Sequence, residues 1–296
     1  MLRLEDLARL AESHADALKA EVAGFELRGR RFGGSARPHL MGVVNLSPDS
    51  WYRESVVLNA EAAIRRGRRL AVEGADLVDV GAESTLLQAA RVDADGQKNV
   101  LLPVVRELSA AGVLVSVETY HPEVTQAALE AGAAVINLTG TRGSAEHYRR
   151  IAAHEAGVII CFVAGDHVRA VGDLRLEDDH TQVLRDYFAR ETELAASCGV
   201  SRIWIDPGLG FYYKNLADSA ERVRYQMRTF LHTFRLRTLG WPTCQALPHA
   251  FEYFEDEVRS AEGFFAVLAT LGRTDLLRTH EVARVRGVVR TLEAGP

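Results

Sequence analysis

The sequence predicts an α/β protein, a (β/α)8 TIM barrel with an N-terminal helical cap. Short apolar runs recur along the 296 residues, and a stretch rich in Ala, Leu, Glu and Arg with helical spacing follows each of them. Eight such units in about 260 residues match this fold, which needs about 250 residues. Most of the runs are apolar on both faces, which is typical of buried parallel strands.

The chain divides into a short leading segment and the barrel. Residues 1–34 hold an amphipathic helix and a short apolar strand, which we expect to cap the bottom of the barrel. Residues 35–296 form the barrel, because no Pro- or Ser-rich linker interrupts them. The eight strands are predicted at residues 39–46, 77–80, 113–118, 134–138, 158–163, 202–206, 243–247 and 275–279.

Polar side chains occupy the carboxyl end of nearly every predicted strand. In a barrel these ends meet on one face, where the active sites of this fold lie. A doubly wound open sheet has the same alternation of strands and helices, but it does not bring all the ends together. The barrel is therefore favoured, and it predicts one mouth lined by Asn45, Glu83, Glu118, Asn137, Asp206, Arg278 and His280.

The composition excludes several classes of partner. With 35 basic and 40 acidic side chains the net charge is −5, whereas nucleic-acid-binding proteins normally carry a basic patch. No apolar run reaches the roughly 18 residues that a membrane span needs, and the charged N-terminus lacks a signal-peptide pattern. Cys161, Cys198 and Cys244 show no metal-ligand spacing. We therefore expect a cytoplasmic protein with reduced thiols and no nucleic-acid or membrane partner.

Two loops after predicted strands carry clustered amide, hydroxyl and carboxyl groups. The first runs Asn45-Leu46-Ser47-Pro48-Asp49-Ser50, and the second contains Ser84-Thr85. Such loops place hydrogen-bond donors and acceptors over a barrel mouth. A turn closed by a local Asx hydrogen bond explains the first loop equally well.

Two later strand ends indicate ligand chemistry. Asp206 ends a buried strand and precedes Pro207-Gly208, a turn at which the backbone can approach a ligand closely. Arg278 and His280 end the last strand on the same side. Because a guanidinium matches phosphate with two parallel hydrogen bonds, this strand predicts an anion site.

These motifs together resemble the dihydropteroate synthase family, the pterin-binding barrels of folate biosynthesis. The matching segments are MGVVNLSPDS, DVGAEST, INLTG, DPGLGF and RTHEV, in the family's order within residues 38–292. The resemblance implies a transferase that condenses 6-hydroxymethyl-7,8-dihydropterin diphosphate with para-aminobenzoate and releases diphosphate. It also implies Mg²⁺ as cofactor, small-molecule substrates and a homodimer.

The same resemblance implies roles for individual residues. Asn45 would lie at the Mg²⁺–diphosphate as the metal-binding residue, and Arg278 with His280 would hold the diphosphate. Asn137 and Asp206 would bind the pterin ring. The catalytic set is then Asn45, Asp206, Arg278 and His280, and the loop residues around the substrates are Ser47, Asp49, Ser50, Ser84 and Thr85.

Three segments depart from the family's pattern. Thr85 is followed by Leu86-Leu87 where the family has Arg-Pro, so a mobile cation is missing. Glu118 replaces the usual aspartate at the end of the third strand. Residues 244–250, Cys-Gln-Ala-Leu-Pro-His-Ala, replace the family's Ser-Arg-Lys, which removes a cation from the pterin and a hydroxyl from the aminobenzoate carboxylate.

The lost cation motivates a hypothesis about Lys214. Asp206 and Glu118 would raise each other's pKa unless a cation relieved the repulsion, and Arg278 is assigned to the diphosphate. We therefore expect Asp206 as the main pterin anchor, Glu118 as the second carboxylate and Lys214 as a pterin-binding replacement cation. His249 is the other candidate for a replacement contact. As a residue of the mouth, Arg278 is expected to tolerate replacement by Ala with little change in melting temperature.

Three alternatives remain at this point. The first is a paralogue that joins the same pterin to a different arylamine, because the changed residues cluster where the second substrate binds. The second is a pterin-binding protein without synthase activity. The third is a methyl-transferring pterin barrel with a corrinoid partner, against which the NLSPDS and RTHEV segments argue because they indicate diphosphate chemistry.

Overall fold

The computed structural model describes residues 1–47, 59–84, 89–140, 143–174, 179–211, 213–216 and 218–295. Within these ranges, eight parallel strands form one sheet in the order β8-β7-β6-β5-β4-β3-β10-β9. Each lies within one or two residues of its predicted position, which confirms the α/β barrel. The strands are β3 (His39–Asn45), β4 (Leu77–Gly81), β5 (Val115–Thr119), β6 (Val135–Leu138), β7 (Gly157–Cys161), β8 (Ile203–Asp206), β9 (Cys244–Ala246) and β10 (Leu276–Thr279).

The sheet curls round until its two outer strands, β8 and β9, meet. A single parallel bridge joins Ile205 to Thr243 at this point of the described chain. The strands pair in parallel register, so that Gly81 pairs with Asn45 on one side and with Glu118 on the other. This register brings the carboxyl ends of the strands to one end of the barrel.

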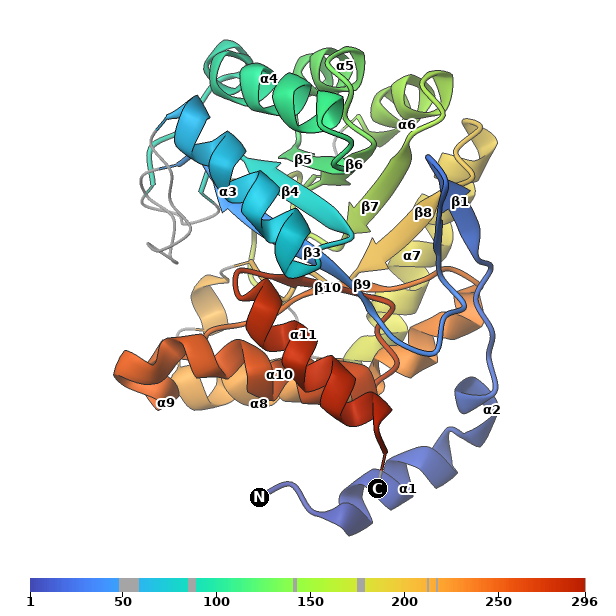
Figure 1. Cartoon of the computed structure of the whole chain (residues 1–296). Coiled ribbons are helices and arrows are strands. Elements are labelled where there is room, and N and C mark those ends of the chain that lie inside the picture. The colour runs from blue at the N-terminus through green and yellow to red at the C-terminus, as the bar shows by residue number, and fades with distance from the viewer. Residues whose placement is uncertain are drawn as a thin grey trace.

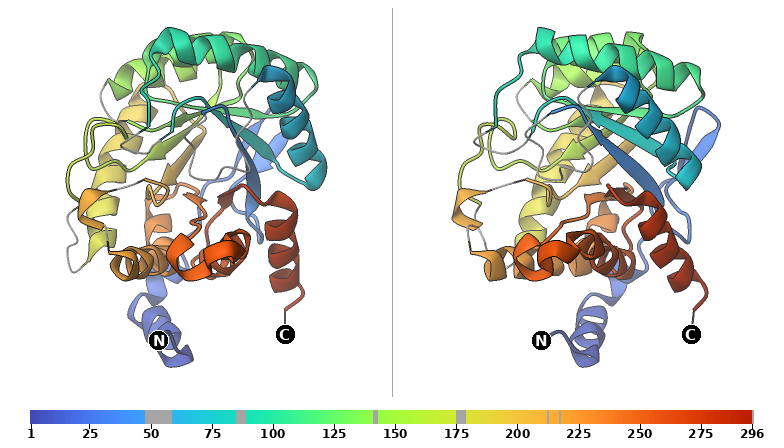
Figure 2. Two further views of the ribbon diagram at one scale, coloured as in Figure 1. Left: turned by 90° about the vertical axis from the view of Figure 1, so that its left-hand side faces the viewer. Right: turned by 60° about the vertical axis from the view of Figure 1, so that its left-hand side comes forward.

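Helices cover the outside of the barrel (Figures 1 and 2). Their starts follow from the sequence, because the side chain of Asn59 accepts a hydrogen bond from the Ala62 amide over 2.8 Å and Asp93 caps the next helix likewise. Among the described residues, no helix is long and apolar enough to cross a membrane. The outer helices are α3 (Ala60–Glu73), α4 (Ala94–Ala110), α5 (Pro122–Glu130), α6 (Ser144–Ala153), α7 (His180–Ser197), α8 (Ser219–His232), α10 (Val258–Leu271) and α11 (Val282–Glu293).

Shorter helical turns lie between these helices and the strands. They are α9 (Phe251–Phe254) and the 3-10 turns η2 (Lys214–Leu216), η3 (Thr233–Leu239) and η4 (Glu255–Glu257). The helices and the strands bury a shared apolar core, to which Leu70 of α3 and Leu101 and Leu108 of α4 contribute fully buried side chains.

The N-terminal segment contacts the amino ends of the strands through Leu27 and Phe32, and a capping role for the whole of residues 1–34 stays a prediction. It contains α1 (Leu4–Ser13), α2 (Ala15–Leu18) and an antiparallel hairpin of β1 (Phe25–Leu27) and β2 (Arg30–Phe32). The sequence predicts one short strand here, and the structure has two. The reason is a tight turn in which Arg28 and Gly29 both adopt positive φ, which suits a two-residue hairpin.

An aromatic cluster fixes this hairpin to the barrel interior. Phe32 is fully buried, and its ring centroid lies 5.2 Å from that of Trp204 on β8. Phe25 approaches the same indole at 4.6 Å in an edge-to-face arrangement. The Arg202 side chain, just before β8, donates to the carbonyl of Glu26 over 2.7 Å. The hairpin therefore lies opposite the end at which the polar residues gather.

We predict that Phe32→Ala lowers the free energy of unfolding by about 3–5 kcal/mol, because it leaves a cavity against Trp204. Urea unfolding at neutral pH measures the change. Val72→Ala, at an exposed position of α3, is the control and should change the free energy by about 0.5 kcal/mol or less. Equal effects of the two substitutions would contradict a packing role for the hairpin.

Candidate active site

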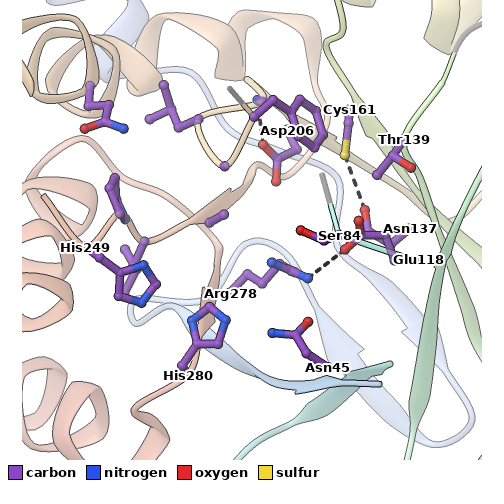
Figure 3. Close-up of a pocket in the computed structure, with 18 of the residues that line it drawn as sticks. Asn45, Ser84, Glu118, Asn137, Thr139, Cys161, Asp206, His249, Arg278 and His280 are labelled. Atoms are coloured by element: carbon purple, nitrogen blue, oxygen red, sulfur yellow. Dashed lines mark hydrogen bonds and ion pairs between the residues drawn. The ribbon is translucent and has the colours of Figure 1, made fainter. Parts of the chain in front are cut away.

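A polar cavity of about 170 Å³ opens at the carboxyl ends of the barrel strands. It receives side chains from most of the strands and from the loops after β8 and β9. Nine residues singled out from the sequence line this cavity, namely Asn45, Glu83, Ser84, Glu118, Asn137, Asp206, His249, Arg278 and His280. Figure 3 shows Arg278 at the centre, with Asp206, Glu118, Asn45 and His280 around it.

The remaining predicted loop residues are placed differently. Ser47 is buried just beyond β3 and is not among the residues that line the cavity. Asp49, Ser50 and Thr85 lie outside the described residues. Lys214 begins η2 after β8, and its side chain is not described, so its proposed contact with the pterin stays a prediction.

A buried ion-pair network surrounds Arg278. Its Nε donates to Oδ2 of Asp79, and its Nη2 donates to Oε2 of Glu118, each over 2.7 Å. Asp79 is fully buried in the middle of β4, where it also accepts from Ser116 over 2.6 Å and from Asn137 over 3.1 Å. The barrel interior therefore contains a guanidinium that is held from two sides by carboxylates.

This network corrects two expectations. Arg278 forms an ion pair with Glu118, and Asp79 is a further carboxylate in contact with it. The expectation that Arg278 serves the diphosphate and leaves the carboxylates without a cation from a strand is therefore wrong. Arg278 is also enclosed, with only 15% of its side chain exposed. Its removal would leave two carboxylates buried without their cation, which is costly. The premise of the expected tolerance, that Arg278 contributes little to the interior, is therefore wrong, and Arg278→Ala is expected to destabilise the fold.

Burial governs the charge of the two predicted pterin carboxylates. It raises the pKa of Glu118 to about 7, with Asp79 adding to the rise and Arg278 opposing it. Burial likewise raises the pKa of Asp206 to about 6, while a hydrogen bond from the Gly208 amide opposes the rise. Each carboxyl group can therefore exchange a proton near neutral pH when its surroundings change.

The turn after β8 holds Asp206 in a fixed position. Oδ1 of Asp206 accepts from the amide of Gly208 over 2.8 Å. Gly208 has φ +77, and a Cβ there would lie 2.3 Å from the carbonyl oxygen of Phe162. Only glycine fits this position without displacing the backbone, so the Asp-Pro-Gly segment positions the carboxylate.

Asn137 connects the network to a buried thiol. Its amide nitrogen donates to Asp79, and its oxygen accepts from the Cys161 thiol over 3.3 Å. These contacts fix which way the amide points. Burial raises the pKa of Cys161 well above its usual value, so this cysteine remains a thiol at the cavity wall.

An arginine from the segment after β7 supports the loop after β4. Arg169 is buried and donates to the carbonyls of Ser84 and Ala89 over 3.1 and 2.5 Å. Its Nε lies 3.6 Å from Glu83, which also accepts from the Tyr120 hydroxyl over 2.7 Å. Arg169 is not among the residues that line the cavity, so it positions Ser84 and Ala89 from behind and supplies no charge to the cavity wall.

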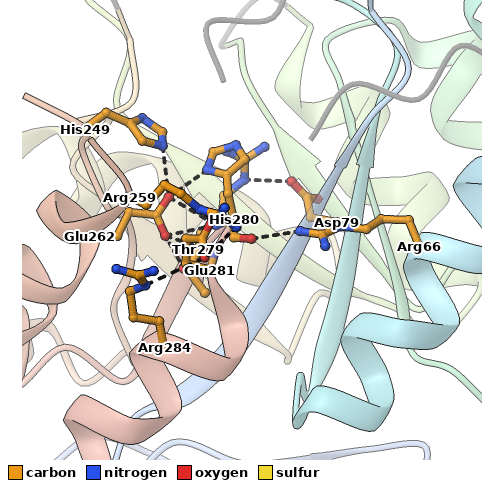
Figure 4. Close-up of polar contacts among 10 residues, drawn as sticks. Arg66, Asp79, His249, Arg259, Glu262, Thr279, His280, Glu281 and Arg284 are labelled. Atoms are coloured by element: carbon orange, nitrogen blue, oxygen red, sulfur yellow. Dashed lines mark hydrogen bonds and ion pairs between the residues drawn. The ribbon is translucent and has the colours of Figure 1, made fainter. Parts of the chain in front are cut away.

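A second polar cluster lies beside His280 (Figure 4). Glu262 of α10 is fully buried, and its Oε1 lies 2.8 Å from Nδ1 of His280 and 3.0 Å from Nε2 of His249. The pKa of Glu262 is held far below its usual range by hydrogen bonds from both histidines, which outweigh its burial. Burial lowers the pKa of His280 to about 4.

Sequence reasoning missed several charged groups of this site, among them Asp79 and Glu262, and also Arg222 and Glu252 at the cavity wall. Asp79 interrupts the apolar strand Leu77–Gly81, and a carboxylate inside a buried strand is the signal that could have identified it. Glu262 lies on a helix where nothing in the pattern separates it from surface acids. The stretch after β9 presents Ala246, Leu247, Pro248, His249 and Glu252 to the cavity, so it supplies no lysine or arginine there.

The fold and the cavity define a (β/α)8 barrel with a cavity at the carboxyl ends of its strands, where the active sites of barrel enzymes lie. The model of the pterin binding enzyme family matches residues 41–246. The chain belongs to this family.

Individual relatives agree with this assignment. The chain is 27% identical to dihydropteroate synthase of Escherichia coli K12 over 88% of its own length and 92% of that enzyme. It is 31% identical, over 87% of its length, to a probable bifunctional folylpolyglutamate synthase/dihydropteroate synthase of Halobacterium salinarum, of which it spans 31%. The structure of Xanthomonas albilineans dihydropteroate synthase with 4-aminobenzoic acid superposes with a TM-score of 0.74, at 28% identity over 92% of this chain and 98% of that one.

We predict that Arg278→Ala lowers the free energy of unfolding by about 3–5 kcal/mol, because Asp79 and Glu118 lose their shared cation. Chemical denaturation measures it. Arg65→Ala removes an exposed ion pair with Glu61 and should change the free energy by about 1 kcal/mol or less. A loss no larger than that of the control would show that Arg278 is not needed to balance these carboxylates.

A second prediction concerns pH. Because the folded protein raises the pKa of Glu118 to about 7, it keeps a proton that the unfolded chain has lost, and this contribution to stability disappears as pH rises through that value. Glutamine cannot ionise. The free energy of unfolding of Glu118→Gln minus that of the parent should therefore increase by about 2–3 kcal/mol between about pH 5 and about pH 8. A difference that is constant or falls with pH would contradict the raised pKa.

Proposed function

We propose that this protein is a dihydropteroate synthase. It condenses 6-hydroxymethyl-7,8-dihydropterin diphosphate with para-aminobenzoate and releases diphosphate. One observation carries the proposal: a single cavity combines buried carboxyl and amide groups at its floor with Arg278, His280 and Asn45 beside them. Such a cavity suits a ligand that has a hydrogen-bonding ring at one end and an anion at the other.

The floor of the cavity would recognise the pterin ring. A pterin presents neighbouring N–H groups and acceptors along its aminopyrimidinone edge. Asp206 supplies a carboxylate that is held by the Gly208 amide, and Asn137 supplies an amide of fixed orientation. A carboxylate that accepts two N–H groups forms a charge-assisted and therefore strong contact.

Glu118 adds a carboxyl group that can be protonated or ionised near neutral pH. With a pKa near neutrality it can accept a ring N–H when ionised or donate to a ring nitrogen when protonated. Its pairing with Arg278 keeps the group in place in either state. Glu118 therefore suits the second pterin contact.

The leaving diphosphate would lie toward Arg278, His280 and Asn45. Arg278 uses two of its nitrogens on Asp79 and Glu118, and its fork of five donors leaves further N–H groups for an oxyanion. His280 is oriented by Glu262 and lines the same cavity. A diphosphate beside His280 would favour the imidazolium and so raise the low pKa of this group.

The residues present also fit Mg²⁺. Amide and phosphate oxygens are hard donors of the kind that Mg²⁺ prefers, and it is usually held by one or two protein groups and substrate phosphates. Asn45 supplies such an oxygen at the end of β3, one strand away from Gly81, and it lines the same cavity as Glu118. When bound, the ion would supply positive charge to the departing diphosphate.

The reaction needs no protein nucleophile. The bond between the pterin methylene carbon and the diphosphate oxygen breaks, and the oxygen keeps the electron pair. The amine nitrogen of para-aminobenzoate forms the new C–N bond and loses one proton. The protein's share is to hold the two substrates in line and to stabilise the diphosphate as its charge develops.

The acceptor would enter on the side lined by Phe211, Leu247, Pro248 and Phe251. This wall is apolar and suits an aromatic ring. We take para-aminobenzoate as the acceptor because the full-length relatives are dihydropteroate synthases; the different arylamine and the inactive binding protein are not favoured. The cytoplasmic location and the homodimer stay predictions of the sequence.

Purified protein, incubated with the pterin diphosphate, Mg²⁺ and para-aminobenzoate, should release diphosphate and form dihydropteroate in equal amounts. Chromatography of the product together with a coupled assay for diphosphate measures both. Omission of para-aminobenzoate is the control for simple hydrolysis. Pterin binding without product would identify a binding protein, and product only with another arylamine would identify the paralogue.

Asp206→Asn should weaken pterin binding about 10- to 100-fold, because it replaces a charge-assisted contact by a neutral one. Lys214→Ala should weaken it by about 1 kcal/mol if the lysine reaches the ring. Calorimetric titration with the pterin diphosphate compares the two with the parent. Parental affinity in Lys214→Ala would show that the site functions without this cation, and a smaller loss in Asp206→Asn than in Lys214→Ala would remove Asp206 as the main anchor.

A further inference from the structure

Three metal-ligating side chains from three elements meet at the wall of the cavity. His249 follows β9, Glu262 belongs to α10, and His280 follows β10. One ligand atom of each lies within 4.8 Å of those of the other two. Oε1 of Glu262 is 2.8 Å from Nδ1 of His280 and 3.0 Å from Nε2 of His249. Figure 4 shows the two histidines on either side of this carboxylate's contacts.

The carboxylate of Glu262 uses its two oxygens differently. Oε2 accepts from the Thr279 hydroxyl and from the amides of His280 and Glu281, the latter two over 3.0 and 3.2 Å. Oε1 faces both imidazole rings and also lies 3.1 Å from the His280 amide. Ligating carboxylates in metal sites are fixed in this way by outer hydrogen bonds to the backbone and to hydroxyl groups.

The distances suit coordination of one ion. Two ligands that bind a metal at about 2.1 Å lie about 3.4 Å apart at the tetrahedral angle of zinc sites and about 3.0 Å apart at the right angle of octahedral sites. The separations of 2.8 and 3.0 Å lie close to the octahedral value and need to widen by about 0.5 Å for a tetrahedral ion. Two histidines and one carboxylate are also the donor set of catalytic zinc sites and of non-haem iron(II) sites.

We propose that His249, Glu262 and His280 bind one divalent transition-metal ion, of the zinc or iron(II) class, at the wall of the cavity. Because the rings of His249 and His280 line the cavity, the other coordination positions of the ion face it. Such an ion is distinct from Mg²⁺ at Asn45, since imidazole is a poor ligand for Mg²⁺. One carboxylate and two neutral imidazoles carry a charge of −1, so a divalent ion makes this wall positive and attractive to an anionic ligand.

A titration with Co²⁺ tests this proposal, because Co²⁺ occupies zinc sites and absorbs visible light when bound to nitrogen and oxygen ligands. The full-length protein is first freed of metal with a chelator, and Co²⁺ is then added without substrate. We expect one Co²⁺ per chain, displaced by an equivalent of Zn²⁺ and not by millimolar Mg²⁺. No visible absorption and no stoichiometric binding in the parent protein would overturn the proposal and leave Glu262 as a hydrogen-bonded support for the two rings.

Variants assign the ion to these residues. His249→Ala and Glu262→Gln should each weaken Co²⁺ binding at least tenfold. His154→Ala, which removes an exposed histidine after α6, is the matched control and should bind as the parent does. Parental affinity in His249→Ala would overturn the proposal. If Glu262→Gln fails to fold, as judged by circular dichroism, His249→Ala decides alone, because the His249 ring lies at the cavity wall and outside the barrel strands.

This readout needs neither substrate nor turnover. An inactive protein that binds Co²⁺ through His249 and Glu262 would refute the synthase assignment and retain the metal site. An active protein that does not bind Co²⁺ would refute the metal site and retain the synthase assignment. The two proposals therefore stand or fall separately.

Discussion

The ion pairs of Arg278 with Asp79 and Glu118 are the interaction on which the rest of the site depends. A charge moved from water into a protein interior costs several kcal/mol unless partners and hydrogen bonds replace the lost solvation. Arg278 meets this requirement with two carboxylates, and Ser116 and Asn137 satisfy the remaining oxygens of Asp79. Each member of the network is therefore held by at least one other.

The network has a chemical consequence for the cavity. A rigid guanidinium between two acids provides a fixed positive field without the reorganisation that a mobile side chain needs, and such preorganisation is a large part of electrostatic catalysis. Two carboxyl groups with pKa values near neutrality lie within the same field. A ligand that brings N–H groups to one end and negative charge to the other would therefore shift proton occupancy when it binds.

The parts of the molecule that the sequence predicts are those with local signals. The apolar runs place all eight strands, and the convergence of Asn45, Asp206 and His280 follows once the ring is inferred, because a barrel brings its strand ends together. The family motifs add roles that no pattern of spacing implies. The same logic could have included Asp79, which interrupts an apolar strand.

Other features depend on long-range choices of partner that no local pattern records. Arg278 pairs with Asp79, which is 199 residues away in the sequence, across the barrel interior. This ion pair contradicts the expectation that Arg278 serves only the diphosphate. Nothing in the sequence distinguishes Glu262 from an exposed acidic residue of a helix, and only the fold brings its carboxylate into contact with His249 and His280. Arg169 likewise reaches a loop 80 residues earlier in the chain and braces it by contacts to backbone carbonyls, which carry no sequence signal.

The join between β8 and β9 makes the barrel a ring with one weak closure. β9 has three residues, and in the described part of the chain the closure is the single Ile205–Thr243 bridge, which includes the hydrogen bond from the Ile205 amide to the Pro242 carbonyl. Breathing of the barrel is easiest where the fewest backbone bonds must break. Asp206 ends β8, and the stretch after Ala246 follows β9, so the two lie on opposite sides of this closure. A substrate that contacts both would hold the two strands together and would slow amide hydrogen exchange on each of them.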